Sequence, residues 1–404
     1  MLKAKLYNLH PIIFVILLGT FFCRAIYFAS VPYLPMLLTS EKGISFDITS
    51  IILAINPLTT VCTSFFGGAL IDKFGIKRTS FFLVIILFLI LFWCLKNFNT
   101  FDFLIFSVLN GILFSVFETL AKKIISDFAF KNNKSMIFNF RITVINLGTI
   151  LGPFLKIFIF KELSTLIFVL MFIYFAYSFL ILIFYKNTQN TISDIFDIKA
   201  FEAIKFLWKD KIIVFLLIGG IFTFSGIAHL NSTIPQYFIK KSLYVNYGKM
   251  DLYSILLLVN SIMFIFVQYV ILPFLKKKRF FFLIITGNLL ISTSIALFPL
   301  FVSITSLSLI IMLFSIGQAL FYVVIDTLID SLSISKFKGT YFSITNNMFL
   351  GSFIGTLLGG IGIKFFRTEY IFYLFIFLAL ICMLGTFAIL KSFNKLTEKN
   401  IRFT

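Results

Sequence analysis

Long apolar runs separated by short polar stretches recur along the whole chain. A helix needs roughly 20 mostly apolar residues to cross the hydrocarbon core of a bilayer, so each run predicts a membrane-spanning helix. The twelve runs that meet this criterion have approximate limits 11–38, 50–71, 79–95, 102–121, 137–160, 165–185, 212–234, 252–275, 280–298, 305–329, 340–365 and 370–391. The pattern therefore predicts an all-α integral membrane protein.

The longest polar connection, 186–211, separates the first six predicted spans from the last six. We therefore expect an N-terminal six-helix bundle over 1–185, a cytoplasmic linker over 186–211, and a C-terminal six-helix bundle over 212–404 that ends in a short cytoplasmic tail.

The two halves also look like copies of one another. An acid-Thr-Leu triplet begins at Glu118 and returns at Asp326, 208 residues later, and a glycine pair four residues apart returns after 203 residues. The two glycine pairs are Gly148 with Gly152 and Gly351 with Gly355. A repeat of about 200 residues with six spans in each copy is the parallel-repeat pattern of a transporter built from two bundles.

Composition and charge agree with a membrane protein. Hydrophobic residues make up 60% of the chain and charged residues only 13%, which is far from the average of soluble domains. The net charge of +19 comes from basic residues between the spans, with 24 Lys and Arg on the side of the N-terminus and 8 on the other side. The positive-inside rule then places both termini in the cytoplasm, and it explains the charge without a nucleic-acid partner. We expect a multi-pass protein of the plasma membrane, the inner membrane of a bacterium.

One stretch between the second and third predicted spans combines the features of a helix end and a turn. It runs from Gly68 to Arg78, and its informative positions are Gly68, Asp72, Lys73, Gly75, Lys77 and Arg78. Gly75 permits a tight turn, and the Asp72 carboxylate can face a neighbouring helix N-terminus. The basic residues can meet lipid headgroups or an acid such as Asp127. We expect a conformational latch here; the alternative is that the basic residues only set the topology.

This stretch resembles the signature between spans two and three of the major facilitator superfamily, roughly G-x-L-x-D-R-x-G-R-[KR]-[KR], with Lys73 and Ile76 at two usual arginine positions. Gly148, Gly152 and Pro153 form a G-x-x-x-G-P pattern similar to that of the superfamily's drug:proton antiporters. The resemblance implies the major facilitator fold, with two pseudo-symmetric six-helix bundles. From the residues alone, the two glycines form a helix-packing motif that lets neighbouring helices approach closely.

Charged residues inside the predicted spans are candidates for the transport pathway, because a charge in the bilayer core costs at least about 2.5–3.5 kcal/mol. Arg24 lies about 20 Å along its helix, too deep to reach the nearer surface easily. We expect it to line the central cavity and to bind an anionic group or pair with an acid. The alternative is a structural ion pair, or a side chain that snorkels outward. Asn346 and Asn347 are the candidates for the cavity in the second half.

Glu118 and Asp326 occupy matching places in the fourth and tenth predicted spans. Each is predicted either to carry a coupling proton or to form a gate ion pair with Arg141, Lys122 or Lys338. Arg141, near the start of the fifth span, is expected to belong to that gate.

No P-loop, nucleophile constellation or metal-spaced His or Cys cluster is visible in the sequence, so we expect neither an enzyme nor a cofactor or metal site. The sequence favours a monomeric secondary transporter that exports a small, amphipathic or drug-like molecule against inward proton flow. The alternative is an uptake symporter or uniporter for a small metabolite, including an anionic one. A non-transporting membrane protein that kept the fold is a third, weaker hypothesis.

Overall fold

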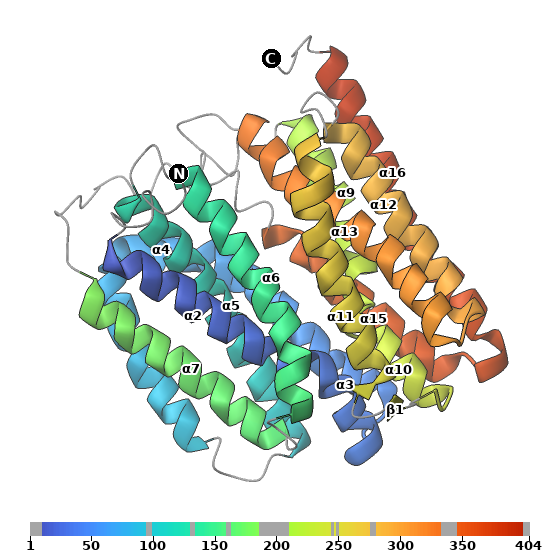
Figure 1. Ribbon diagram of the computed structural model, residues 1–404, viewed down its shortest axis with the longest axis horizontal. Coiled ribbons are helices and arrows are strands. Elements are labelled where there is room, and N and C mark those ends of the chain that lie inside the picture. Colours follow the sequence, from blue (N-terminus) through green and yellow to red (C-terminus); the bar gives the residue numbers. More distant parts are fainter. Residues whose placement is uncertain are drawn as a thin grey trace. The chain divides into compact units, whose positions relative to one another are not determined.

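The computed structural model describes residues 10–93, 99–129, 134–158, 163–185, 210–243, 246–247, 250–274, 280–332 and 346–398. The chain divides into two compact units, each of which is described by itself. Unit 1 contains Met1–Tyr33 and Cys62–Asp194, and unit 2 contains Leu34–Val61 and Ile195–Thr404. Helices dominate both units (Figure 1).

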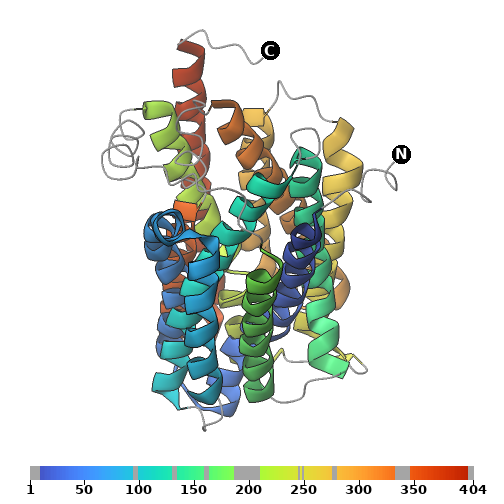
Figure 2. The same cartoon turned by 90° about the vertical axis from the view of Figure 1, so that its left-hand side faces the viewer.

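Unit 1 is a bundle of long helices. It consists of α2 (Pro11–Ser30) with the 3-10 turn Val31–Tyr33, the part of α4 (Phe46–Trp93) that starts at Cys62, α5 (Thr100–Phe128), α6 (Lys134–Phe158) and α7 (Leu163–Phe184). Figure 2 shows the helices of this bundle from the side. The start of α5 is set by a capping box, in which Asn99 and Asp102 each accept a hydrogen bond from the other's backbone N–H.

Helix α2 is central to unit 1 because it packs against α5, α6 and α7. Two glycines of α6 make one of these contacts close: a Cβ on Gly148 would meet the backbone and Cβ of α2 near Arg24, and one on Gly152 would meet α2 at Phe28. The two backbones therefore approach without side chains between them, as expected for small residues one turn apart.

Unit 2 begins with the short segments α3 (Leu34–Met36) and the π-helical turn Leu37–Glu41, followed by the first part of α4, up to Val61. Its other helices are α9 (Lys211–Ala228), α10 (Thr233–Lys240), α11 (Leu252–Phe266), α12 (Phe280–Leu297), α13 (Ile304–Leu332), α15 (Phe349–Phe365) and α16 (Ile371–Glu398). Short π and 3-10 turns cover Val267–Ile271, Leu272–Phe274, Phe298–Leu300 and Thr368–Tyr370. A two-residue hairpin pairs β1 (Asn246–Tyr247) with β2 (Met250–Asp251) in antiparallel register.

The packing of α15 on α9 in unit 2 repeats the packing of α6 on α2 in unit 1. Gly351 and Gly355 of α15 lie against the α9 backbone at Ile221 and Ser225, where a Cβ would overlap main-chain atoms. The glycine pairs that match in sequence therefore make the same kind of contact, each with the first long helix of its own half. This equivalence supports the predicted internal repeat.

A second contact in unit 2 is polar. Asn288 of α12 is fully buried and donates to the Thr223 hydroxyl (2.6 Å) and to the Cys382 carbonyl (3.1 Å). Its side-chain oxygen accepts from the Thr386 hydroxyl at 2.7 Å. One amide thus joins α9, α12 and α16 where lipid and apolar side chains offer no other partners.

The predicted spans correspond to the helices with two differences. Among the described residues, eleven helices are long and apolar enough to cross a membrane, and the expected span 340–365 corresponds to the shorter apolar helix α15, whose predicted first residues lie outside the description. The spans expected at 50–71 and 79–95 belong to one element, α4, in which the helix breaks at Gly75 with φ 77° and ψ 160°. That left-handed φ is readily adopted by glycine, and it makes the turn that the sequence predicts there.

Replacing Asn288 with alanine should destabilise the protein. Interhelical hydrogen bonds in membrane proteins contribute about 0.6–1.7 kcal/mol each, and this change also leaves Thr223 and Thr386 without their shared partner. We expect a lower unfolding temperature in detergent. Thr293→Ala is the matched control, because Thr293 is exposed on the same helix and bonds only to carbonyls of that helix. Equal effects of the two changes would contradict the interhelical role.

Candidate functional site

Three charged side chains from three different helices meet inside unit 1. Arg141 of α6 makes a bidentate contact with Glu118 of α5, with Nη1–Oε1 and Nη2–Oε2 distances of 3.0 and 2.6 Å. Arg24 of α2 donates to the same carboxylate, with an Nη2–Oε2 distance of 3.3 Å. Lys122, one turn further along α5, lies 3.8 Å from Oε1. We call Arg24, Glu118, Lys122 and Arg141 the charge cluster.

Aromatic side chains surround the charge cluster. The Arg24 guanidinium carbon lies 4.3 Å from the centre of the Phe114 ring, one turn before Glu118 on α5, in a cation–π contact. On the same helix, Phe117 stacks against Tyr174 and Tyr177 of α7, with centroid distances of 4.9 and 5.2 Å. The cluster therefore ties α2, α5 and α6 together, and these rings add α7.

The close packing of α6 on α2 explains why these charges reach one another. Gly148 contacts α2 at Arg24 itself, and Arg141 lies seven residues earlier, two turns along the same face of α6. The side chain of Arg141 is only 6% exposed, whereas those of Arg24 and Glu118 are 16% and 18% exposed. The cluster is thus closed on the side of Arg141 and partly accessible at Arg24.

The structure brings together several of the residues singled out in the sequence. Arg24 pairs with an acid, Glu118, and its place in a central cavity stays a prediction. Of the gate partners expected for Glu118, Arg141 and Lys122 are both present. The proton-carrying role of Glu118 stays a prediction. The side chain of Asp326, its counterpart on α13, lies outside the described residues.

The latch residues are described only in part. The backbone of α4 includes Gly68, Asp72 and Lys73, but their side chains lie outside the description. Lys77, Arg78 and Asp127 are exposed. The latch role of this stretch therefore stays a prediction.

The second-half candidates Asn346 and Asn347 come just before α15 and are half-buried. The side-chain oxygen of Asn347 is buried and has no hydrogen-bond partner in the part of the chain that the structure describes. Pro153 lies within α6, one residue beyond the glycine pair, and is buried.

A polar contact in unit 2 was not foreseen from the sequence. Gln236 of α10 donates to the Ser50 hydroxyl of α4 at 3.0 Å, and both residues are buried. A Cβ on Gly360 of α15 would overlap the Ser50 side chain, so only glycine fits there. Nearby, Lys364 and Asp47 form an ion pair at 2.7 Å. These partners are 186 and 317 residues apart, and no local pattern marks them.

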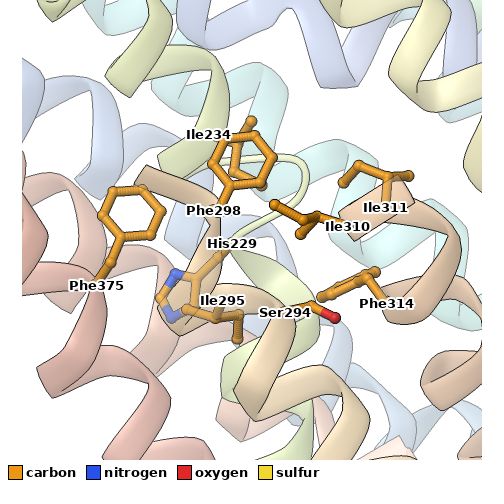
Figure 3. Close-up of a pocket in the computed structure, with 9 residues that line it drawn as sticks. All are labelled: His229, Ile234, Ser294, Ile295, Phe298, Ile310, Ile311, Phe314 and Phe375. Carbon is orange, nitrogen blue, oxygen red and sulfur yellow. The ribbon is translucent and has the colours of Figure 1, made fainter. Parts of the chain in front are cut away.

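Unit 2 also contains a small, largely apolar pocket, with space for about one water molecule. Figure 3 shows the His229 ring and the Ser294 hydroxyl among isoleucine and phenylalanine side chains. His229 Nδ1 lies 2.8 Å from the Thr233 hydroxyl, which gives the buried ring a partner. In the part of the chain that the structure describes, no group of three or more His, Cys, Asp or Glu side chains could hold a metal ion.

Comparison with known proteins decides the family. The sequence pattern of the Major Facilitator Superfamily matches residues 16–350. The chain belongs to this superfamily. It is 29% identical over 381 residues to the uncharacterized MFS-type transporter YqjV of Bacillus subtilis (strain 168), which covers 94% of this chain and 92% of that protein. It is 26% identical over 341 residues to the uncharacterized MFS-type transporter YdeE of Escherichia coli (strain K12), covering 82% and 84%.

Solved structures of other transporters share this fold. The nucleoside transporter NupG superposes with a TM-score of 0.76 at 12% identity, covering 94% of this chain and 99% of that one. A POT family transporter in complex with a thioalcohol-conjugated peptide superposes with a TM-score of 0.74 at 15% identity, covering 95% and 96%. At these identities the likeness concerns the fold alone.

Membership of the superfamily settles the broad class of the protein. This superfamily member is a multi-pass membrane protein and a secondary transporter rather than an enzyme, and its bacterial relatives place it in the plasma membrane. Its exposed phenylalanines, such as Phe88 and Phe92 on α4, fit a surface that faces lipid.

Breaking the charge cluster from one side should destabilise unit 1. Arg141→Met removes the bidentate partner of Glu118 and leaves a long, flexible side chain in its place. Removing one partner of a buried ion pair lowers the free energy of unfolding by about 3–5 kcal/mol. We expect a clearly lower unfolding temperature, partly restored when Glu118→Gln is added. Lys395→Met is the control, because its exposed pair with Glu398 is worth at most about 1 kcal/mol. A melting temperature for Arg141→Met as high as that of the control would show that the cluster does not support the fold.

Proposed function

We propose that this superfamily member is a proton-linked secondary transporter of a small molecule, and that the charge cluster is where proton and substrate influence each other. The observation that carries the proposal is the sharing of Glu118 by Arg24 and Arg141 inside an apolar helix bundle. Charges in such a position are costly and usually mark a substrate or ion pathway. The transporting unit that we propose is a single chain in the lipid bilayer, with both termini in the cytoplasm.

Protonation of Glu118 would change the forces between three helices at once. The ionised carboxylate is the common partner of an arginine on α2 and an arginine on α6. A proton on it removes the negative charge between two positive ones, so α2 and α6 then repel at this point. A transporter can use such a change to favour one of two arrangements of its helices.

The charge of the cluster bears on the direction of transport. A cationic substrate would compete with the proton for Glu118 and would have to displace two arginines. An anionic substrate could instead bind the arginines while Glu118 carries the proton. The excess of positive charge in the cluster favours the second arrangement, in which substrate and proton move together.

The second candidate function is proton-coupled export of a small amphipathic or drug-like molecule. The observation in its favour is the G-x-x-x-G-P pattern at Gly148, Gly152 and Pro153, which resembles that of drug:proton antiporters. In this structure the two glycines pack α6 closely against α2. The two candidate functions differ in the direction in which the proton moves relative to the substrate. In liposomes that contain the protein, an exported substrate moves against the proton, and a co-transported substrate moves with it.

Replacing Glu118 with glutamine should uncouple the transporter, because the amide keeps the shape of the side chain but cannot carry the proton. The measurement is proton flux, read with a pH-sensitive dye inside liposomes, after addition of a panel of organic acids, amino acids, nucleosides and cationic dyes. We expect substrate-evoked proton flux with the unaltered protein and loss of that flux with Glu118→Gln. Glu369→Gln is the control, an exposed acid of unit 2 outside the cluster. Flux that survives in Glu118→Gln would refute the proposed role of Glu118.

A further inference from the structure

The charge cluster holds more positive than negative charge. Arg24, Lys122 and Arg141 surround one carboxylate, that of Glu118, so the cluster carries a formal excess of two positive charges when Glu118 is ionised. Lys122 is 42% exposed and can be solvated, but the two arginines are 16% and 6% exposed. An uncompensated charge at this depth in a membrane protein is costly unless a further anion joins it.

The two arginines also have hydrogen-bond donors that the cluster does not use. An arginine has five N–H donors, and a single hydrogen bond, to Glu118 Oε2, is found for Arg24 among the described residues. The Arg141 Nε–H is buried, and no described residue accepts a hydrogen bond from it. A buried donor without an acceptor is rare in folded proteins, and both arginines have side chains suited to bidentate recognition of a carboxylate.

The unused donors of Arg24 lie beside an apolar, aromatic surface. The Phe114 ring lies against the guanidinium, with a distance of 4.3 Å from its centre to the guanidinium carbon, and Tyr27 lies 6.2 Å from Phe114 between ring centres. Of the two arginines, Arg24 is the more accessible to a ligand, with 16% of its side chain exposed against 6% for Arg141. A molecule bound there would place a charged group on the guanidinium and its body along these rings.

We propose that Arg24 is the binding site for the carboxylate of a small organic anion with an apolar or aromatic body. The ligand's carboxylate takes the place on Arg24 that the Glu118 carboxylate occupies in this structure, so one carboxylate replaces another of the same shape and charge. The inference rests on the proposed proton-linked transport, in which Glu118 gives up its charge to a proton.

Proton and anion then bind together. The ionisable groups that face Glu118 come from every helix around it: Arg24 from α2, Lys122 from α5, Arg141 from α6, and Tyr174 and Tyr177 from α7. Protonating Glu118 frees Arg24 and increases the positive charge of the cluster, which strengthens anion binding. By thermodynamic linkage the bound anion strengthens proton binding by the same factor. Because each of the two favours the binding of the other, we expect the anion and the proton to be transported together.

Binding of three matched series of small ligands tests the assignment. The series are phenyl and straight-chain alkyl carboxylates, the corresponding alcohols and the corresponding amines, so only the charge of the head group differs between them. The readout is the ligand-induced rise in unfolding temperature of the purified full chain in nanodiscs, at mildly acidic and at neutral pH. We expect stabilisation by members of the carboxylate series and a larger effect at the acidic pH.

Variants then locate the site. Arg24→Gln should weaken carboxylate binding by about tenfold or more, because a charge-assisted bidentate contact is lost. Arg24→Lys keeps the charge and should bind carboxylates more tightly than Arg24→Gln. Glu118→Gln should bind carboxylates at least as tightly as the unaltered protein, with no difference between the two pH values. Lys156→Gln is the matched control, since Lys156 is another basic residue of unit 1 over an aromatic ring, that of Tyr33 at 5.4 Å. It should bind like the unaltered protein.

The outcomes separate this inference from the proposed function. If no carboxylate binds in a way that depends on Arg24, or if amines bind instead, the anion site is refuted even where Glu118→Gln abolishes proton flux. If carboxylates bind through Arg24 but their transport moves no protons, the anion site stands and the proton-linked function fails. Equal loss of binding in Arg24→Gln and Lys156→Gln would point to a general effect of charge and would also overturn the site.

Discussion

The sharing of one buried carboxylate by two arginines is the interaction on which unit 1 depends most. Glu118 lies between α2 and α6, which are otherwise held by glycine-mediated backbone packing and apolar contacts. Apolar contacts within lipid discriminate little between one helix arrangement and another, because lipid tails are as apolar as the side chains. A charge that must be paired discriminates strongly, so the cluster favours one packing of α2, α5 and α6 over others.

The glycine pairs make this arrangement possible in both halves of the chain. In unit 1 they bring α6 onto α2 at the level of Arg24, and in unit 2 the equivalent pair brings α15 onto α9. The polar contacts that accompany this packing differ between the two halves. In unit 1 ionised side chains join α2, α5 and α6, and in unit 2 the neutral side chain of Asn288 joins α9, α12 and α16.

Several features followed directly from the residues. The apolar runs marked the helices within a few residues, Gly75 marked the break in α4, and the depth of Arg24 marked it as a residue in need of an anionic partner. These signals are local: they depend on hydropathy over one helix, on the backbone freedom of glycine, or on the distance of a charge from the membrane surface. The role of Gly148 and Gly152 in helix packing was also visible, because small residues one turn apart occur where helices approach closely.

The sequence by itself therefore determined the class of protein, its internal repeat and the set of buried charges. Only the tertiary structure decided which residues meet. It pairs Arg24 with Glu118 across 94 residues and Gln236 with Ser50 across 186, and it packs Gly360 against Ser50. The physical reason is that hydropathy tells how far a helix extends but not how it is rotated against its neighbours. That rotation is set by the combined packing of all the helices in a unit, and it selects the partner of each charge.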